Sequence, residues 1–238
     1  WETSSGIKLT DFKMNAVVVE SAEYSPDGKK IVAAFDENAI IWDASSGKIL
    51  AELKGHSKWV ATARFSPDGE KIVTASDDNT AKIWDANSGE LLVDFKGHND
   101  EVIFAQFSPD GKEIVTASKD YTCIIWDASS GKVLAELFGH TKKVNSIQFS
   151  PDGRKIVTTS NDKTAKIWDA NSGEKLADLK GYTREDNFAQ FSPDGKKIVT
   201  ACGDGTGTIW DADSGKIFTH LKGHSQPINF AEFSPDGK

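Results

Sequence analysis

The sequence predicts an all-β protein built from repeated four-stranded units, and three recurring motifs support this prediction. Ser-Pro-Asp-Gly occurs six times and Gly-His four times, in a common register. Trp-Asp pairs recur 42 residues apart, starting at Trp42, Trp84, Trp126, Trp168 and Trp210. Self-similarity at a fixed period of about 40–45 residues is typical of proteins in which each repeat is one supersecondary unit.

Residues 55–96 illustrate how one repeat accounts for four strands. The predicted strands are residues 59–65, 71–76, 80–84 and 91–95. Ser66-Pro67-Asp68-Gly69 predicts a turn after the first strand, because Pro presets φ and Gly permits φ > 0. The second strand is rich in β-branched residues, as strands generally are. One small sheet cannot bury both of its faces alone, so we expect the copies to stack on one another.

The Gly-His and Trp-Asp motifs resemble those of the WD40-repeat family over the whole length of the chain. The near-uniform repeats are most similar to bacterial WD40 proteins, or to an engineered protein based on them. The resemblance implies a WD40 β-propeller of 42-residue, four-stranded antiparallel blades. In a single domain over residues 1–238, the expected parts are the outer strand of a closing blade (1–13), five blades (14–54, 55–96, 97–138, 139–180 and 181–222) and a partial blade (223–238).

This division predicts about six blades, with the closing blade incomplete. An outer strand at 7–12 and an inner strand at 227–233 would both belong to that blade. Three explanations remain open: a longer chain with a seventh blade, a gap filled by another chain, or an engineered protein with an incomplete blade. An unfilled gap exposes sheet edges, so self-association through the incomplete blade is one expectation.

Composition argues against several kinds of partner. The formal net charge is −8, from 36 acidic and 28 basic residues, which disfavours nucleic acid and anionic membranes. No apolar run of about 18 residues and no signal peptide is present, so we expect a cytoplasmic protein. The Asp-Ala-Asn-Ser-Gly turns lack the spaced ligands of a calcium loop, so we expect neither a metal nor a cofactor.

The resemblance implies a structural role for the recurring polar residues. In WD40 blades, a histidine before the first strand, a hydroxyl on the second, an aspartate after it and the third-strand tryptophan form a hydrogen-bonded network. The corresponding sets here are His56, Ser76, Asp78 and Trp84; His98, Ser118, Asp120 and Trp126; and His140, Ser160, Asp162 and Trp168. A Ser-His-Asp triad is the alternative, but a triad would occur once, so we assign no catalytic residue. The first blade lacks the hydroxyl near Phe35, and the fifth has Tyr182 for His and Cys202 for Ser.

Residues that differ between repeats are the candidates for binding. The resemblance places the start of each first strand, and each turn between the second and third strands, on a top face around the central channel. Candidate partner-binding residues at these positions are Trp59, Glu101, Lys143, Asn145, Glu185, Asp77, Lys119 and Asn161. Trp59 stands out because the other six tryptophans share one register, and aromatic anchors are favoured in interfaces. Packing over a neighbouring blade is the alternative role for Trp59.

Asp186 replaces an apolar residue of the other repeats, so it either faces the channel or marks a displaced strand.

The leading functional hypothesis is a non-catalytic scaffold that binds peptides or protein domains on the top face. Such a scaffold could serve as the sensor domain of a larger bacterial signalling protein. One alternative is a designed or recently amplified repeat protein without an evolved ligand. Another is an enzyme with its active site in the channel, which is disfavoured because His220 is the only histidine outside the Gly-His register.

Overall fold

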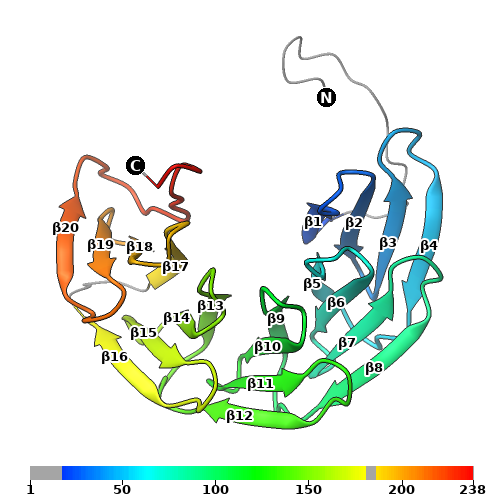
Figure 1. Cartoon of the computed structure of the whole chain (residues 1–238), viewed down its shortest axis with the longest axis horizontal. Coiled ribbons are helices and arrows are strands. Elements are labelled where there is room, and N and C mark those ends of the chain that lie inside the picture. Colours follow the sequence, from blue (N-terminus) through cyan, green and yellow to red (C-terminus); the bar gives the residue numbers. More distant parts are fainter. Residues whose placement is uncertain (1–17, 181–185, 238) are drawn as a thin grey trace.

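The structure, a computed structural model, describes residues 18–180 and 186–237, with the backbone only at residues 186 and 187. Twenty strands form five four-stranded antiparallel sheets, and the described ranges contain no helix. The sheets follow one another around an arc, with an opening between the first and the last (Figure 1). This arrangement confirms the predicted all-β propeller fold.

Each sheet is one blade, whose strands run in chain order from the channel to the rim. Blade 1 contains β1 (Ser21–Tyr24), β2 (Lys30–Phe35), β3 (Asn38–Asp43) and β4 (Ile49–Lys54). Blade 2 contains β5 (Val60–Phe65), β6 (Lys71–Ser76), β7 (Thr80–Asp85) and β8 (Leu91–Lys96). Blade 3 contains β9 (Val102–Phe107), β10 (Glu113–Ser118), β11 (Cys123–Asp127) and β12 (Val133–Leu137). Blade 4 contains β13 (Val144–Phe149), β14 (Lys155–Ser160), β15 (Thr164–Asp169) and β16 (Lys175–Leu179). Blade 5 contains β17 (Asp186–Phe191), β18 (Lys197–Cys202), β19 (Gly207–Asp211) and β20 (Ile217–Leu221).

The turn between the first two strands of each blade is closed by its own side chains. In blade 2, the Ser66 hydroxyl donates to Asp68 Oδ1 at 2.6 Å and accepts the Lys71 N–H at 2.9 Å. Gly69 has φ +74°, a left-handed conformation that glycine adopts without steric cost. These contacts end the inner strand sharply and place all such turns at one end of the channel, which we call the bottom end.

The hydrophobic core lies between the blades rather than within any one of them. One cluster joins Ile41 and Leu53 of blade 1 to Val60 and Trp84 of blade 2. Equivalent clusters join blades 2 and 3, 3 and 4, and 4 and 5. Trp84 is 1% exposed, and burying one large apolar side chain in this way contributes about 1.5–3 kcal/mol. Adjacent blades therefore stabilise each other, as the sequence analysis expected.

The expected inner strand at 227–233 is not a strand in the structure, which corrects that prediction. A strand is defined by ladder pairing, and none of the five sheets of the described residues includes this segment. Two hydrogen bonds still hold it along blade 5: Ile228 N–H donates to Cys202 O at 3.1 Å, and Phe233 N–H donates to Gln190 Oε1 at 3.3 Å. The expected outer strand at 7–12 lies outside the described residues.

Candidate functional site: the two ends of the central channel

The recurring polar residues of blades 2, 3 and 4 form one hydrogen-bonded chain inside each blade. In blade 2, His56 Nδ1 lies 2.8 Å from Asp78 Oδ2, and His56 Nε2 lies 2.8 Å from Thr74 Oγ1. The indole N–H of Trp84 donates to the same Thr74 oxygen at 2.8 Å. The equivalent bonds join His98, Asp120, Thr116 and Trp126 in blade 3, and His140, Asp162, Thr158 and Trp168 in blade 4.

The shared hydroxyl in this hydrogen-bonded network belongs to Thr74 and not, as predicted from the sequence, to Ser76. Trp84 lies opposite Ile72 in the ladder, so its indole N–H meets the next side chain on that face, which is Thr74. Ser76 lies further toward the turn, where its hydroxyl donates to Lys58 O at 3.2 Å and accepts the Asp78 N–H at 3.1 Å. Ser118 and Ser160 make the same two contacts in blades 3 and 4. The recurrence of threonine at 74, 116, 158 and 200 was the sequence signal for the correct position.

Hydrogen bonding fixes the protonation states of this chain. Burial raises the pKa of Asp78, but hydrogen bonds from Thr80, the Ser57 N–H and His56 outweigh it and lower the pKa to about 2. The carboxylate can only accept, so His56 Nδ1 is the donor and Nε2 accepts from Thr74. Burial lowers the pKa of His56 despite the opposing effect of Asp78, which agrees with a neutral imidazole. The polar side-chain atoms of this hydrogen-bonded network therefore serve to hold the blade together.

The top end of the channel carries most of the sequence-predicted binding residues, and the structure brings them together in pairs. The residue before each network aspartate donates its backbone N–H to the start of the inner strand. These bonds join Asp77 to Trp59 at 2.9 Å, Lys119 to Glu101 at 2.9 Å, and Asn161 to Lys143 at 3.0 Å. Glu185 lies outside the described residues, and nothing is described of the Asp186 side chain beyond its strand position in β17.

The three pairs differ in chemistry from blade to blade. In blade 2, Trp59 is 48% exposed, so about half of its surface is not covered by the rest of the protein. In blade 3, Glu101 and Lys119 form an ion pair. In blade 4, Asn145 Nδ2 donates to Asn161 Oδ1 at 2.6 Å, beside Lys143. Burial, reinforced by the nearby Glu101 carboxylate, raises the pKa of Asp77.

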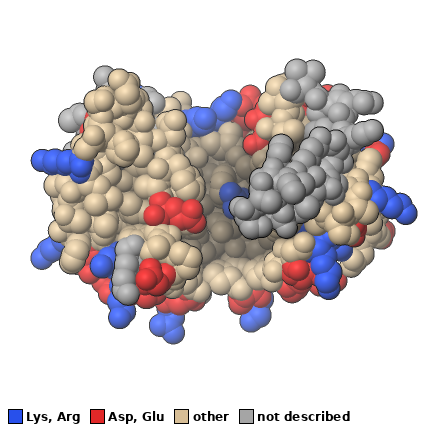
Figure 2. Space-filling model, turned by 90° about the horizontal axis from the view of Figure 1, so that it is seen from above, with Lys and Arg blue, Asp and Glu red and all other residues tan. Residues whose placement is uncertain are grey.

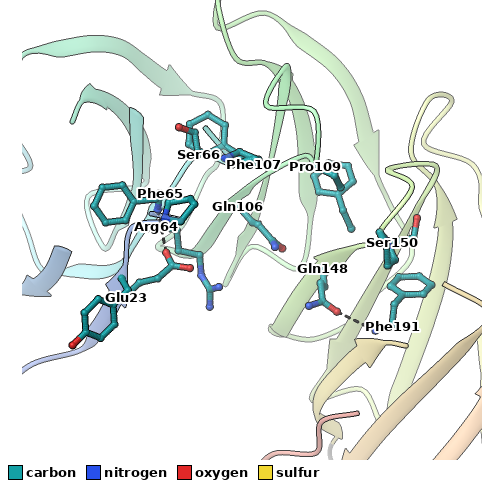
Figure 3. A pocket seen from close by; sticks show the side chains of 15 residues that line it. Glu23, Arg64, Phe65, Ser66, Gln106, Phe107, Pro109, Gln148, Ser150 and Phe191 are labelled. Carbon is teal, nitrogen blue, oxygen red and sulfur yellow. Dashed lines mark hydrogen bonds between the residues drawn. The ribbon is translucent and has the colours of Figure 1, made fainter. Parts of the chain in front are cut away.

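A second feature at the bottom end was not predicted from the sequence. A cavity of about 440 Å³ opens there, lined by the ends of the inner strands and by the Ser-Pro turns. In the view toward the opening between blades 1 and 5, the centre of the molecule is hollowed (Figure 2). The channel-facing side chains at the penultimate inner-strand position are Glu23, Arg64, Gln106 and Gln148 (Figure 3). The sequence signal was the variation at this position, close to a uniform Ser-Pro-Asp-Gly motif.

Several of these channel-facing side chains link one blade to the next. The Phe65 N–H donates to Glu23 Oε2 at 3.0 Å, and the Phe191 N–H donates to Gln148 Oε1 at 3.0 Å. Gln190 does the same for Phe233. Each link satisfies an N–H on the channel-facing edge of an inner strand, which would otherwise remain unpaired.

Within residues 18–180 and 186–237, no three His, Cys, Asp or Glu side chains gather closely enough to hold a metal ion. The same ranges hold no helix long and apolar enough to cross a membrane. Cys123 and Cys202 are both buried and form no disulfide bond with each other.

The sheets, their order and the recurring network define a repeat-built β-propeller. The family model described as "WD domain, G-beta repeat" matches residues 47–85, 89–127, 131–169 and 176–211, so the chain belongs to the WD40-repeat family. Each match covers the outer strand of one blade and the three inner strands of the next. No curated protein matches the chain as a relative. WD40 repeats are generally non-catalytic scaffolds for protein interactions.

Proposed function

We propose that this protein is a non-catalytic scaffold that binds a peptide or protein domain at the top end of its channel. The exposed indole of Trp59 is the observation that carries the proposal. It is the only tryptophan outside the repeat register, and the repeat does not require it. Large exposed aromatic side chains are the residues that most often anchor a protein partner.

The charges beside Trp59 support the same function. Asp77 is its backbone partner, and the Glu101–Lys119 ion pair lies on the next blade. Lys143 follows on blade 4. Alternating charges around an aromatic anchor select the orientation of a partner more than they raise its affinity. We extend the proposal to a cytoplasmic protein that acts as the sensor of a larger bacterial signalling system.

Affinity capture with a matched control tests the proposal. Immobilised wild-type protein is compared with a Trp59→Ala/Lys143→Ala variant, and retained proteins are quantified by mass spectrometry. The control is Leu92→Ala/Lys132→Ala, which removes one exposed apolar side chain and one lysine at the outer edge of the sheets. We expect the top-end variant to lose a specific partner about tenfold or more and the control to keep it. Equal retention by all three proteins would refute the proposal.

A further inference from the structure

We infer that the cavity at the bottom end binds the carboxylate of a peptide, with Arg64 as its principal contact. This site lies at the opposite end of the channel from Trp59 and would act independently of it. Arg64 departs from the pattern of the repeat. Arg64 is the only cation among the penultimate inner-strand residues, which are otherwise Glu23, Gln106, Gln148 and Gln190.

Arg64 cannot perform the structural role of its counterparts. Glu23, Gln148 and Gln190 each accept an N–H from the next blade, but a guanidinium has no acceptor atom. In the described part of the chain, Arg64 makes no hydrogen bond or ion pair. Its guanidinium lies over the Phe104 ring, with Cζ 4.6 Å from the centroid. The ring orients the group and leaves its N–H donors available to a ligand.

The neighbouring glutamines suit the same ligand. Gln148 Oε1 is occupied by the Phe191 N–H, so only its Nε2 donor remains for a ligand. Gln106 extends toward the same space as Arg64 (Figure 3), and its buried Oε1 has no hydrogen-bond partner among the described residues. A ligand should therefore present an anionic acceptor to Arg64 and Gln148 and a nearby N–H to Gln106. A peptide carboxylate with its adjacent amide offers both.

The charge and the volume of the cavity further restrict the class of ligand. The cavity holds one basic side chain, Arg64, and one acidic side chain, Glu23. Burial raises the pKa of Glu23, although the nearby charge of Arg64 opposes this shift. A dianionic phosphate would be repelled by Glu23, and the single positive charge of Arg64 could not balance its two negative charges. The single negative charge of a carboxylate can be balanced by Arg64 alone. Pro67, Pro109 and Pro151 line the cavity and provide an apolar surface for the flanking residues. A volume of about 440 Å³ is in the range of small-ligand sites and suits a peptide end or side chain rather than a folded domain.

Nuclear magnetic resonance with short peptides tests the site and identifies the source of the carboxylate. The probes are acetyl-Ala-Ala-Val with a free carboxylate, the same peptide amidated, and amidated acetyl-Ala-Asp-Ala. Each is titrated to about 5 mM, which is sufficient to detect millimolar affinity. We expect saturable shifts of the Arg64 Nε–H and of the Gln106 and Gln148 side-chain amides with one or both carboxylate peptides. The neutral peptide should cause none.

Four variants complete the test. Arg64→Gln should weaken binding about tenfold or more, the effect of losing a charge-assisted hydrogen bond, and Arg64→Lys should give an intermediate loss. Arg154→Gln removes an exposed arginine from a Ser-Pro-Asp-Gly-Arg turn and should bind like wild type. Trp59→Ala/Lys143→Ala should also bind like wild type, which separates this site from the top end. Absence of saturable shifts with both carboxylate peptides, or unchanged binding by both Arg64 variants, would overturn the inference.

Discussion

Blades 1 and 2 surround the equivalent buried tryptophan with different side chains, polar in blade 2 and apolar in blade 1. Around Trp84 of blade 2, Thr74 is bonded into the polar chain and Lys82 pairs with Asp94 at 2.7 Å. Around Trp42 of blade 1, the positions of Thr74 and Lys82 are occupied by Ala33 and Ile40, which form an apolar cluster with the indole. Both blades are four-stranded antiparallel sheets of the same order.

The polar network is therefore one way to stabilise a blade and not a condition for forming one. Buried polar groups stabilise a fold only when each is satisfied, and apolar replacements of similar volume are often neutral. His56, Asp78 and Thr74 satisfy one another, so removing a single member should cost more than the network itself contributes. Function should then lie in residues that the repeat does not require.

The largest effect should come from Asp78→Asn. The Asp78 carboxylate accepts from His56, the Ser57 N–H and Thr80, and an amide would turn a donor toward these donors. We expect a loss of about 3 kcal/mol in the free energy of unfolding, measured by denaturant titration. Asp36→Asn in blade 1 is the matched control and should cost less than about 0.5 kcal/mol. Similar losses for both variants would break the contrast between the blades.

Thr74→Val should have the next largest effect. Valine keeps the shape of threonine but leaves His56 Nε2 and the Trp84 N–H without a buried partner, at a cost of about 2 kcal/mol. Ser76→Ala removes contacts to Lys58 O and the Asp78 N–H and should cost about 1 kcal/mol. If the order of the two losses were reversed in thermal or chemical unfolding, Thr74 would not be the shared hydroxyl.

Acid should weaken blades 2 and 4 through their histidines. Burial lowers the pKa of His56 and of His140 from the ordinary value of 6.5. The unfolded chain then binds protons that the folded chain does not, so stability should fall as the pH drops below about 6.5. A second loss should follow below about pH 4, where Asp78 titrates in the unfolded chain. Unfolding measured from pH 7 to 3 tests this, with His56→Gln/His140→Gln expected to flatten the first phase.

The smallest effect concerns the turns before the third strands. Tyr121 and Lys163 have φ 74° and 68°, whereas blade 5 has Gly205 at the corresponding place with φ 85°. A side chain in the left-handed region costs about 1–2 kcal/mol, and glycine costs extra entropy in the unfolded chain. Tyr121→Gly and Lys163→Gly should therefore each stabilise the protein by about 0.5 kcal/mol in thermal melts. Destabilisation by either would show that its side chain makes contacts that offset the strain.

Most of the fold could be predicted from the sequence because each blade is specified by local signals. Turn residues, strand periodicity and the 42-residue repeat agree with one another in blades 2 to 5. The segment 227–233 was mispredicted because strand pairing depends on a partner that local sequence does not supply. Thr74 was missed because Thr74 and Ser76 both place a hydroxyl on the same face of β6 and differ only in their hydrogen-bond partners. The cavity beside Arg64 was missed because it is formed jointly by the inner strands of several blades.

In this protein, we propose, the repeated residues hold the blades together and the non-repeated residues at the channel ends bind partners. One measurement tests it most directly: partner retention by Trp59→Ala/Lys143→Ala and by Thr74→Val, at a temperature where circular dichroism shows both to be folded. We predict that the first variant loses the partner with unchanged stability, and that the second keeps the partner while melting earlier. Loss of the partner by folded Thr74→Val, with retention by the Trp59 variant, would show that the repeated residues, and not Trp59, bind the partner.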